Sequence, residues 1–331
     1  MLSAPKPVWI LLLISLLSAG CERSSANAIK YSGPAESPEK AVLPTIETIQ
    51  SGTYRPLSRP LYLYVNTAAL QKPAVRAFLQ YYFSDEGQEL VADVGYIKLP
   101  AEEFQKQLKT LNDAIQQVVP NSPDPDLKTL TGEVMVDGSS TVAPISTAVA
   151  EEFFRMCPKV RVPVGTSGTG GGFKKFSAGE IDICDASREI SDTERELCRK
   201  AEIDVLELRI GLDGIVIAVN PQNSWIDGLT VEDLQKIWNT GSTVQRWTDL
   251  NPNFPDAPIK LFGPDTDSGT FEYFTEEICS GKGASRSDYQ QSSDDNFLVS
   301  GIMNDPFSLG YFGFAYYAEN QNKLKALAIA P

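Results

Sequence analysis

The sequence contains no histidine, and this absence excludes several kinds of catalytic and metal site. No histidine-based catalytic triad, zinc–histidine site or histidine proton shuttle can form without an imidazole. Basic residues are also few: 29 Lys and Arg stand against 43 Asp and Glu, which gives a net charge of −14. This surplus of negative charge argues against nucleic acid and anionic membrane surfaces as partners. We therefore expect no catalytic residue, no metal, no cofactor and no nucleic acid partner.

Long apolar runs are almost absent, and the one at the start is too short to span a bilayer. Residues 8–17 (VWILLLISLL) follow Lys6 and precede Ser18-Ala19-Gly20-Cys21, which resembles a bacterial lipobox. We predict a lipoprotein signal peptide over residues 1–20, lipidation at Cys21 and a disordered tether over residues 21–44. A leucine is usual where Ser18 stands, so ordinary signal-peptide cleavage is the alternative. The expected location is the periplasm or the outer face of the cytoplasmic membrane.

Cysteine is scarce beyond residue 21. Cys157, Cys184, Cys198 and Cys279 allow three pairings, and export would place them in an oxidising compartment. Their spacing is unlike that of a metal site. A structural disulfide and buried free thiols both remain open.

A glycine-rich loop, Gly165–Lys174 (GTSGTGGGFK), is the most distinctive stretch that is present. It follows a short strand-like segment and opens a predicted helix, so its free N–H groups favour a bound anion. Gly170, Gly171 and Gly172 are the leading candidates. The loop lacks the Gly-Lys-Ser/Thr ending of a P-loop, the spacing of a dinucleotide motif and the second glycine of a nucleophile elbow. A flexible surface loop is the competing interpretation.

Predicted strands and helices alternate along the chain, which indicates an α/β fold. They include a helix over residues 73–94 and strands over residues 204–208, 214–220 and 309–317. Two further strand-to-helix junctions carry small hydroxyl residues or glycine: Ser139–Val142 and Ser268–Thr270. Each alone is typical of an ordinary helix cap, but three together can surround a small oxyanion with donors. Asp185, an acceptor when ionised, would select an oxyanion that still carries a proton, such as hydrogen phosphate, over sulfate. Arg188 can add a charge-assisted contact.

These motifs resemble those of the periplasmic phosphate-binding proteins (PstS type) of the high-affinity ABC phosphate importer. The resemblance rests on Asp137–Val142, the glycine loop, Asp185–Arg188, Asp267–Phe271 and Leu309–Asn320, and on Ser84–Gln88 with Val94–Tyr96. It implies a two-lobed type II periplasmic-binding-protein fold with a hinge between the lobes. The phosphate contacts that we predict are Ser140, Thr141, Val142, Thr169, Gly170, Gly171, Asp185, Arg188, Ser268, Gly269 and Thr270.

The chain departs from that family in two respects. Many members carry an arginine four residues before the serine of Ser-Gly-Thr, where this chain has Pro264, and we expect Arg188 to replace it. The family's C-terminal segment also precedes its N-terminal one here, so we predict a circularly permuted chain order. A mis-assembled gene is the alternative. The predicted parts are residues 45–120 (family C-terminal segment, in lobe 1), 121–131 (linker), 132–210 (lobe 1), 211–304 (lobe 2) and 305–331 (return strand to lobe 1).

The resulting hypothesis is an exported, monomeric solute-binding protein that is not an enzyme. It would capture inorganic phosphate and pass it to the permease subunits of an ABC transporter, held at the lipid membrane by its anchor. Binding proteins for sulfate or molybdate are the near alternative, and a phosphate sensor is another. A serine hydrolase would need Ser167 or Ser268 paired with Lys174 or Lys175, because histidine is absent.

Overall fold

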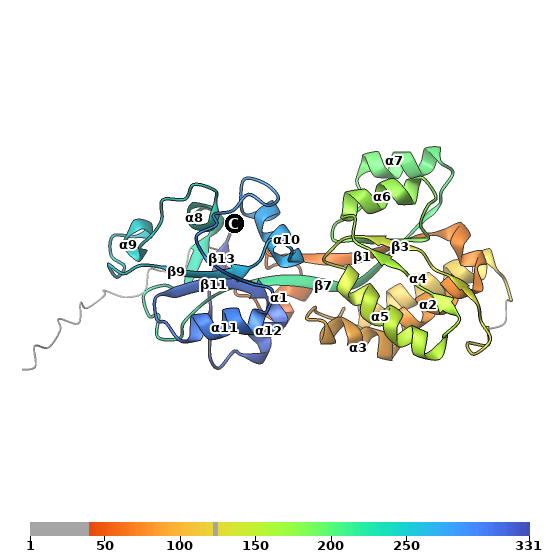
Figure 1. The fold of residues 1–331 in the computed structure, drawn as a ribbon, viewed down its shortest axis with the longest axis horizontal. Coiled ribbons are helices and arrows are strands. Elements are labelled where there is room, and N and C mark those ends of the chain that lie inside the picture. Colours follow the sequence, from red (N-terminus) through yellow and green to blue (C-terminus); the bar gives the residue numbers. More distant parts are fainter. Residues whose placement is uncertain (1–39, 122–124) are drawn as a thin grey trace, which may run out of the picture. The chain divides into compact units, whose positions relative to one another are not determined.

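The computed structural model describes residues 40–121 and 125–331. The predicted signal peptide, Cys21 and residues 21–39 of the predicted tether lie outside the described residues. Within them, two long strands, β1 (Ser58–Asn66) and β7 (Val205–Val219), run antiparallel and connect two groups of elements (Figure 1). The two groups have separate hydrophobic cores, which we call the first and second lobes.

The first lobe contains mostly helices packed around the first half of β7 and the second half of β1. Its elements are η1 (Thr67–Gln71), α2 (Pro73–Tyr82), α3 (Asp85–Asp93), α4 (Ala101–Val118), β2 (Gly132–Glu133), β3 (Val136–Gly138), α5 (Ala143–Met156), β4 (Val160–Arg161), β5 (Val164–Gly165), α6 (Thr169–Ser177), β6 (Ile183–Ala186) and α7 (Asp192–Lys200).

The second lobe is built around the apolar second half of β7 and around Trp238, which packs edge-on against Phe274, Tyr289 and Tyr311. Its elements are α1 (Ile46–Gln50), β8 (Gly228–Thr230), α8 (Val231–Trp238), α9 (Trp247–Leu250), β9 (Lys260–Pro264), α10 (Gly269–Glu277), β10 (Gln290–Ser292), α11 (Asp295–Met303), β11 (Ser308–Gly313), α12 (Phe314–Glu319), β12 (Lys325–Ala326) and β13 (Ala328–Ala330).

One sheet passes through both lobes in the order β10-β9-β11-β7-β1-β6-β3-β5. β1 pairs antiparallel with β7 on one side and with β6 on the other, while β3 pairs parallel with β6 and β5. Parallel neighbours place the carboxyl ends of β3, β5 and β6 at one edge, where helices α5 and α6 begin. This topology gathers the sequence motifs at that edge.

The structure corrects two of the predicted domain assignments. Residues 45–57 were expected in the first lobe, but Ile49, Tyr54 and Leu57 are buried in the core of the second. Residues 305–331 were expected to return to the first lobe, but β11, β12 and β13 all pair within the second. The strand that returns is β1, which pairs with β7 along its whole length and with β6 in the first lobe.

The predicted secondary structure differs from the structure in three places. Two separate strands were expected near residues 204–208 and 214–220, but they form the single strand β7. The backbone stays extended through Gly211 and Gly214, where β7 passes from one lobe to the other. The helix expected over residues 73–94 is divided at Ser84, whose hydroxyl caps α3. The strand expected over residues 309–317 ends at Gly313, and α12 follows.

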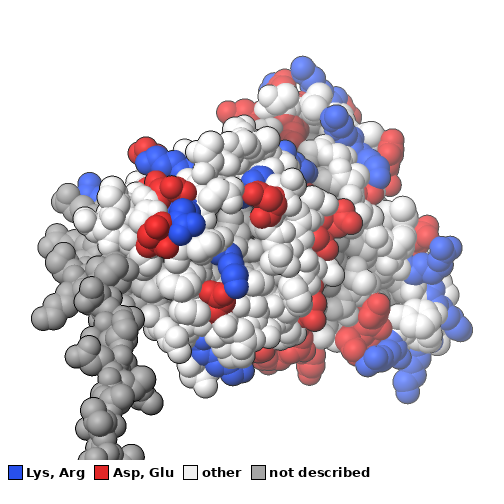
Figure 2. All heavy atoms as spheres, turned by 60° about the vertical axis from the view of Figure 1, so that its left-hand side comes forward, with Lys and Arg blue, Asp and Glu red and all other residues white. Residues whose placement is uncertain are grey.

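The four described cysteines are buried free thiols, so the alternative of a disulfide is not realised in this structure. Among residues 40–121 and 125–331, no helix has the length and apolarity to cross a bilayer. The same residues contain no cluster of three potential metal ligands from Cys, Asp and Glu. Acidic and basic side chains are interspersed over the face shown in Figure 2, and many are ion-paired, such as Arg246 with Asp256.

Candidate functional site

The three strand-to-helix junctions predicted from the sequence meet in the structure. The N–H of Gly168 donates to the carbonyl of Gly138 at 2.8 Å, which joins the glycine loop to the turn before α5. The N–H of Ser139 donates to the carbonyl of Asp185 at 2.9 Å. On the second lobe, Gly269 lies so close to Thr141 that an added Cβ would be 2.8 Å from the Thr141 hydroxyl oxygen. The starts of α5, α6 and α10 therefore converge.

Several backbone N–H groups at these helix starts are unused. Among the described residues, no acceptor is present for the N–H groups of Val142, Thr169, Gly170, Gly171 and Gly269. Helix N-termini with free N–H groups attract anions, through both hydrogen bonding and the helix dipole. Gly172 differs from the prediction, because its N–H donates to the carbonyl of Gly168 as part of the helix. Its role is close packing instead: a Cβ there would be 2.7 Å from the Cα of Gly138.

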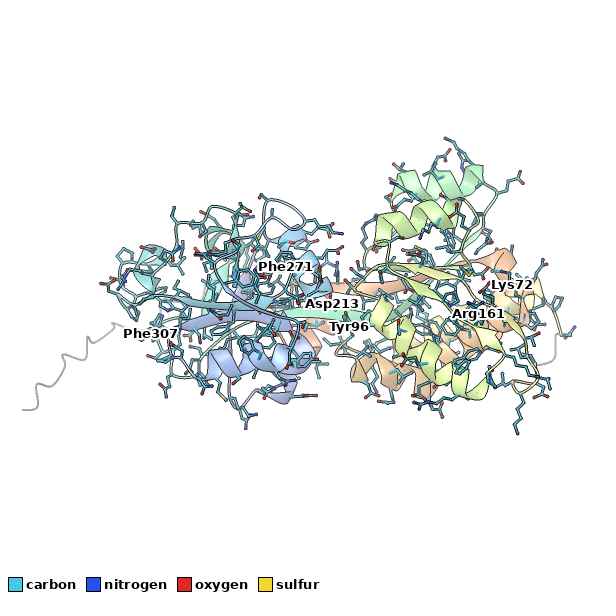
Figure 3. All side chains as sticks on the ribbon, viewed as in Figure 1. Lys72, Tyr96, Arg161, Asp213, Phe271 and Phe307 are labelled. Carbon is cyan, nitrogen blue, oxygen red and sulfur yellow. The ribbon has the colours of Figure 1, made fainter. Side chains whose placement is uncertain are left out.

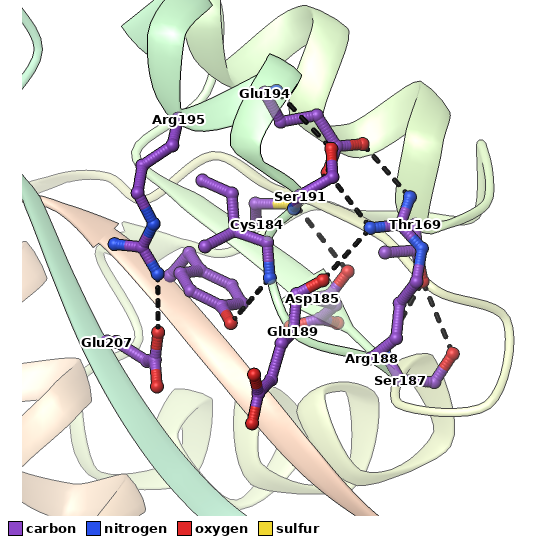
Figure 4. Close-up of polar contacts among 12 residues, drawn as sticks. Thr169, Cys184, Asp185, Ser187, Arg188, Glu189, Ser191, Glu194, Arg195 and Glu207 are labelled. Atoms are coloured by element: carbon purple, nitrogen blue, oxygen red, sulfur yellow. Dashed lines mark hydrogen bonds and ion pairs between the residues drawn. The ribbon is translucent and has the colours of Figure 1, made fainter. Parts of the chain in front are cut away.

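The predicted hydroxyl and cap residues have varied partners. Ser140 donates to the Glu272 carboxylate at 3.1 Å, and Ser268 caps α10 by accepting from the N–H of Thr270 at 3.2 Å. The Thr169 hydroxyl lies 3.3 Å from that of Ser187 (Figure 4). Anion binding by Ser140, Ser268 and Thr270 stays a prediction, since these groups already have an internal partner.

Asp185 is fully buried at the end of β6. Its Oδ1 accepts a hydrogen bond from the Ser146 hydroxyl at 3.0 Å, and Ser146 in turn lies 3.2 Å from the Tyr82 hydroxyl. Its Oδ2 has no partner among the described residues. Burial raises the pKa of Asp185 to about 8, with the Asp137 carboxylate adding to the rise against the Ser146 hydrogen bond. This carboxyl therefore holds its proton at neutral pH until a ligand changes its surroundings.

Ser146 and Tyr82 were missed by the sequence reasoning. Ser146 lies on the inner face of α5 and Tyr82 at the end of α2, at positions where helical periodicity predicts only core residues. The Ser146 hydroxyl holds one carboxylate oxygen of Asp185 and is itself in contact with the Tyr82 hydroxyl, while the other Asp185 oxygen stays without a partner among the described residues. The signal available in the sequence was a polar residue among apolar neighbours, which is too common to be specific.

Arg188 lies beside the glycine loop, but its guanidinium is engaged elsewhere. Nη1 and Nη2 each donate to the Glu194 carboxylate at 2.9 Å (Figure 4). Glu194 is also held by the backbone N–H and hydroxyl of Ser191, in a capping box at the start of α7. The bidentate pair does not favour the predicted role of Arg188 as a replacement for the missing arginine near Pro264.

Arg59 is the second functional candidate that the sequence reasoning missed. It lies on β1 where that strand passes between the lobes, and its side chain is 12% exposed. Nη2 donates to the Thr141 hydroxyl at 2.9 Å, and Nε donates to Asp213 at 3.3 Å. The guanidinium carbon lies 3.6 Å from the ring centroid of Tyr273 on α10. Figure 3 labels Asp213 on β7, a strand that connects the lobes, and Tyr96 in the loop between α3 and α4.

Two cavities adjoin these groups. A cavity of 330 Å³ is lined by the glycine loop from Ser167 to Gly171 and by Glu272 and Lys282 of the second lobe. A cavity of 510 Å³ is lined by Arg59 and Tyr273, together with Ser187 and Arg188. Both contain residues from both lobes. An anion of the size of phosphate therefore has space beside the start of α6.

Neither serine named for a hydrolase has the geometry of an activated nucleophile. The Ser167 hydroxyl donates to Asp137 at 2.6 Å, and Lys175 pairs with the same carboxylate. Burial acts to raise the pKa of Asp137, but the bonds from Lys175 and Ser167 outweigh it and lower that pKa. No hydrogen bond connects a lysine to Ser167 or Ser268 in the described part of the chain, so the Ser–Lys arrangement that a hydrolase would need is not formed.

Comparison with known proteins agrees with this geometry. Residues 102–329 match the model of the PBP superfamily domain. The chain is 47% identical over 198 residues to Protein SphX of Synechocystis, which covers 59% of each chain. It is 39% identical over 198 residues to the phosphate-binding protein PstS of Staphylococcus saprophyticus, covering 60% of each. The chain thus spans about three-fifths of the length of the curated relatives it matches.

A solved structure gives the same indication. A crystal structure described as a possible phosphate binding protein from Planctomyces limnophilus is 51% identical, with a TM-score of 0.59. The match covers 61% of this chain and 71% of that one. The predicted α/β fold of type II binding proteins is thereby confirmed, whereas the permuted chain order stays a prediction. With more than half of its residues matching the family model, the chain belongs to the PBP superfamily of binding proteins.

Proposed function

We propose that this protein binds inorganic phosphate between its two lobes and delivers it to the permease of an ABC importer. The observation that carries the proposal is the free Oδ2 of the buried Asp185 beside three converging helix starts. Donors alone would suit any oxyanion. A carboxyl that shares one proton with the ligand suits an oxyanion that can itself hold a proton near neutral pH.

The backbone N–H groups supply the rest of the proposed site. Val142, Thr169, Gly170, Gly171 and Gly269 offer five donors from three helices and both lobes. Hydrogen bonds to an ionised partner stabilise a complex by roughly 1.5–3 kcal/mol each, so a few of them suffice for micromolar binding. Because the donors come from two lobes, binding favours their approach, as in hinge closure. The names of the relatives, two of them phosphate-binding proteins, support the same substrate.

A calorimetric titration of the protein with phosphate, sulfate and molybdate in separate runs tests the proposal. We expect saturable one-to-one binding of phosphate and much weaker binding of the other two at about pH 8.5, where Asp185 is ionised. Tighter sulfate or molybdate binding would instead assign the site to another oxyanion. A folded protein that binds none of the three would reject the function.

Export and anchoring belong to the same proposal. An ABC import partner requires a location outside the cytoplasmic membrane, and lipidation at Cys21 would keep the protein there. We also propose that the protein is a monomer and turns over no ester substrate. Separation of the cell membrane and the soluble periplasmic fraction, compared between the natural protein and Cys21→Ser, distinguishes a lipid anchor from ordinary cleavage.

A further inference from the structure

We propose that Arg59, on the strand that connects the lobes, is the cationic ligand of the bound anion. This inference rests on the proposed phosphate function and names the residue that supplies its positive charge. The sequence pointed to Arg188 for that role, but the bidentate pair with Glu194 neutralises its guanidinium. Near the loop, Lys175 is paired with Asp137 and Lys282 with Glu272, whereas Lys174 is an exposed side chain that lines the 330 Å³ cavity and has no ion pair among the described residues.

The donors of Arg59 are only partly used. A guanidinium has five N–H groups, and here two of them donate, one to Thr141 and one to Asp213. The other three have no partner among the described residues, although the side chain is largely buried and lines the 510 Å³ cavity. Nη1 has no hydrogen-bond partner among the described residues and is not fully buried, so it is open to the cavity. This cavity and the 330 Å³ cavity of the glycine loop share Ser187, Arg188 and Glu276 in their linings, and an oxyanion held between them would satisfy these donors with the fork geometry that arginine presents to phosphate.

The surroundings of Arg59 hold it in this position. Asp213 is buried on β7 directly across from it, where β1 residue Arg59 and β7 residue Asp213 are partners in the ladder. Burial raises the pKa of Asp213, and the Arg59 charge opposes that rise. The pair therefore brings a buried positive charge to the site with its counter-charge behind it, which lowers the cost of burial. The Tyr273 ring supports the flat face of the guanidinium.

The same contacts connect Arg59 to the helix starts. The Thr141 hydroxyl accepts the Arg59 bond with an oxygen lone pair, so its own O–H proton remains available to an anion. Gly269 of α10 lies against that hydroxyl. Arg59 is thus adjacent to the junction of both lobes while belonging to the strand between them. A bound anion would therefore contact the first lobe, the second lobe and strand β1, which connects them.

The test is calorimetric titration with phosphate of the natural protein and of four variants: Arg59→Lys, Asp213→Asn, Arg59→Gln/Asp213→Asn and Arg188→Gln. The double variant removes both charges, so no unpaired carboxylate is left buried. We expect phosphate affinity in the double variant to fall about tenfold to a hundredfold. Arg59→Lys should lie between, since it keeps the charge without the fork, and Asp213→Asn should bind within about threefold of the natural protein. Arg195→Gln, an exposed arginine that pairs with Glu207 and lines neither cavity, is the matched control and should bind normally.

The outcomes separate the two proposals. Melting temperatures and circular dichroism of each variant show whether it is folded. A folded double variant with unchanged phosphate affinity would overturn the role of Arg59 and leave the phosphate function standing. A larger loss in Arg188→Gln than in the Arg59 variants would assign the cationic contact to Arg188. If the natural protein binds no phosphate, the function itself fails, and Arg59 loses its ligand with it.

Discussion

At the residue scale, the site depends on which polar atoms the fold leaves without a partner. Asp185 could be singled out from the sequence because it follows a strand and precedes small residues. Its separation into one satisfied and one free oxygen depends on Ser146, which is 39 residues away in sequence and is brought close by α5. Arg188 was also singled out from the sequence, but the fold gives its guanidinium a partner. A residue of suitable charge at a suitable position is neutralised by a carboxylate six residues later.

Replacing Asp185 with Asn should stabilise the protein in a pH-dependent way. The pKa of Asp185 rises from 3.8 to about 8 on burial, so folding opposes its ionised form. Its contribution to stability is therefore complete below about pH 4 and is lost as pH rises toward about 8. The amide of the variant cannot ionise, so the melting temperature of Asp185→Asn should exceed that of the natural protein more at about pH 9 than at about pH 5.

The control for this comparison is Asp267→Asn, because Asp267 is exposed. Its melting temperature should follow that of the natural protein across the same pH range. Equal pH profiles for Asp185→Asn and the natural protein would show that Asp185 is ionised in the folded state at low pH.

Selectivity should also depend on pH. Below the pKa of about 8, the protonated Asp185 can donate to sulfate, whereas above it the carboxylate repels that fully ionised anion. Hydrogen phosphate brings its own proton and retains the contact. The ratio of sulfate to phosphate dissociation constants should therefore widen as pH rises from about 6 to about 9, as measured by competition titrations. A constant ratio would show that Asp185 does not discriminate between the anions.

At the element scale, α6 depends on glycine for two separate reasons. Gly172 packs against the Cα of Gly138 and lies where a Cβ would be 2.8 Å from the Cys184 sulfur. Gly170 has space, since the nearest atom to a Cβ would be an Arg188 nitrogen at 3.8 Å. The sequence shows three identical glycines here, and only the packing of α6 on β3 and β6 distinguishes them.

Gly172→Ala should consequently lower the free energy of unfolding by about 1–3 kcal/mol, because backbone and a buried thiol cannot move away from the added methyl group. Gly170→Ala, the matched control, should change it by no more than about 0.5 kcal/mol. Urea denaturation of the two variants measures both values. Similar losses in both would show that close packing of Gly172 does not distinguish the two positions.

At the scale of the whole molecule, the predicted permuted order requires that segments near residues 42 and 329 lie close together. Val42 and Ile329 form an antiparallel bridge, with both N–H···O bonds at 2.9 Å. Residues 40 and 331 are therefore opposite each other on neighbouring extended segments.

A reverse permutant tests this idea. We expect a chain that joins Pro331 to Lys40 through a short Gly/Ser linker, and that opens between Leu130 and Thr131, to fold with a similar melting temperature and similar phosphate affinity. A second permutant opened within β7 should not fold, because that strand pairs on both sides and contributes to both cores. If the first permutant does not fold, the prediction that this chain is a circular permutation of the family's chain order is rejected.

The sequence by itself determined the alternating α/β pattern and the helix starts, and it predicts an anion site at the glycine loop. These follow from local rules: the periodicity of apolar residues, capping, and the free N–H groups of a first helical turn. The tertiary structure alone decided that β7 is one strand, that β1 returns between the lobes, and that Arg59 and Ser146 adjoin the predicted motifs. Those features depend on contacts between residues 39 to 154 positions apart, which local sequence patterns do not encode.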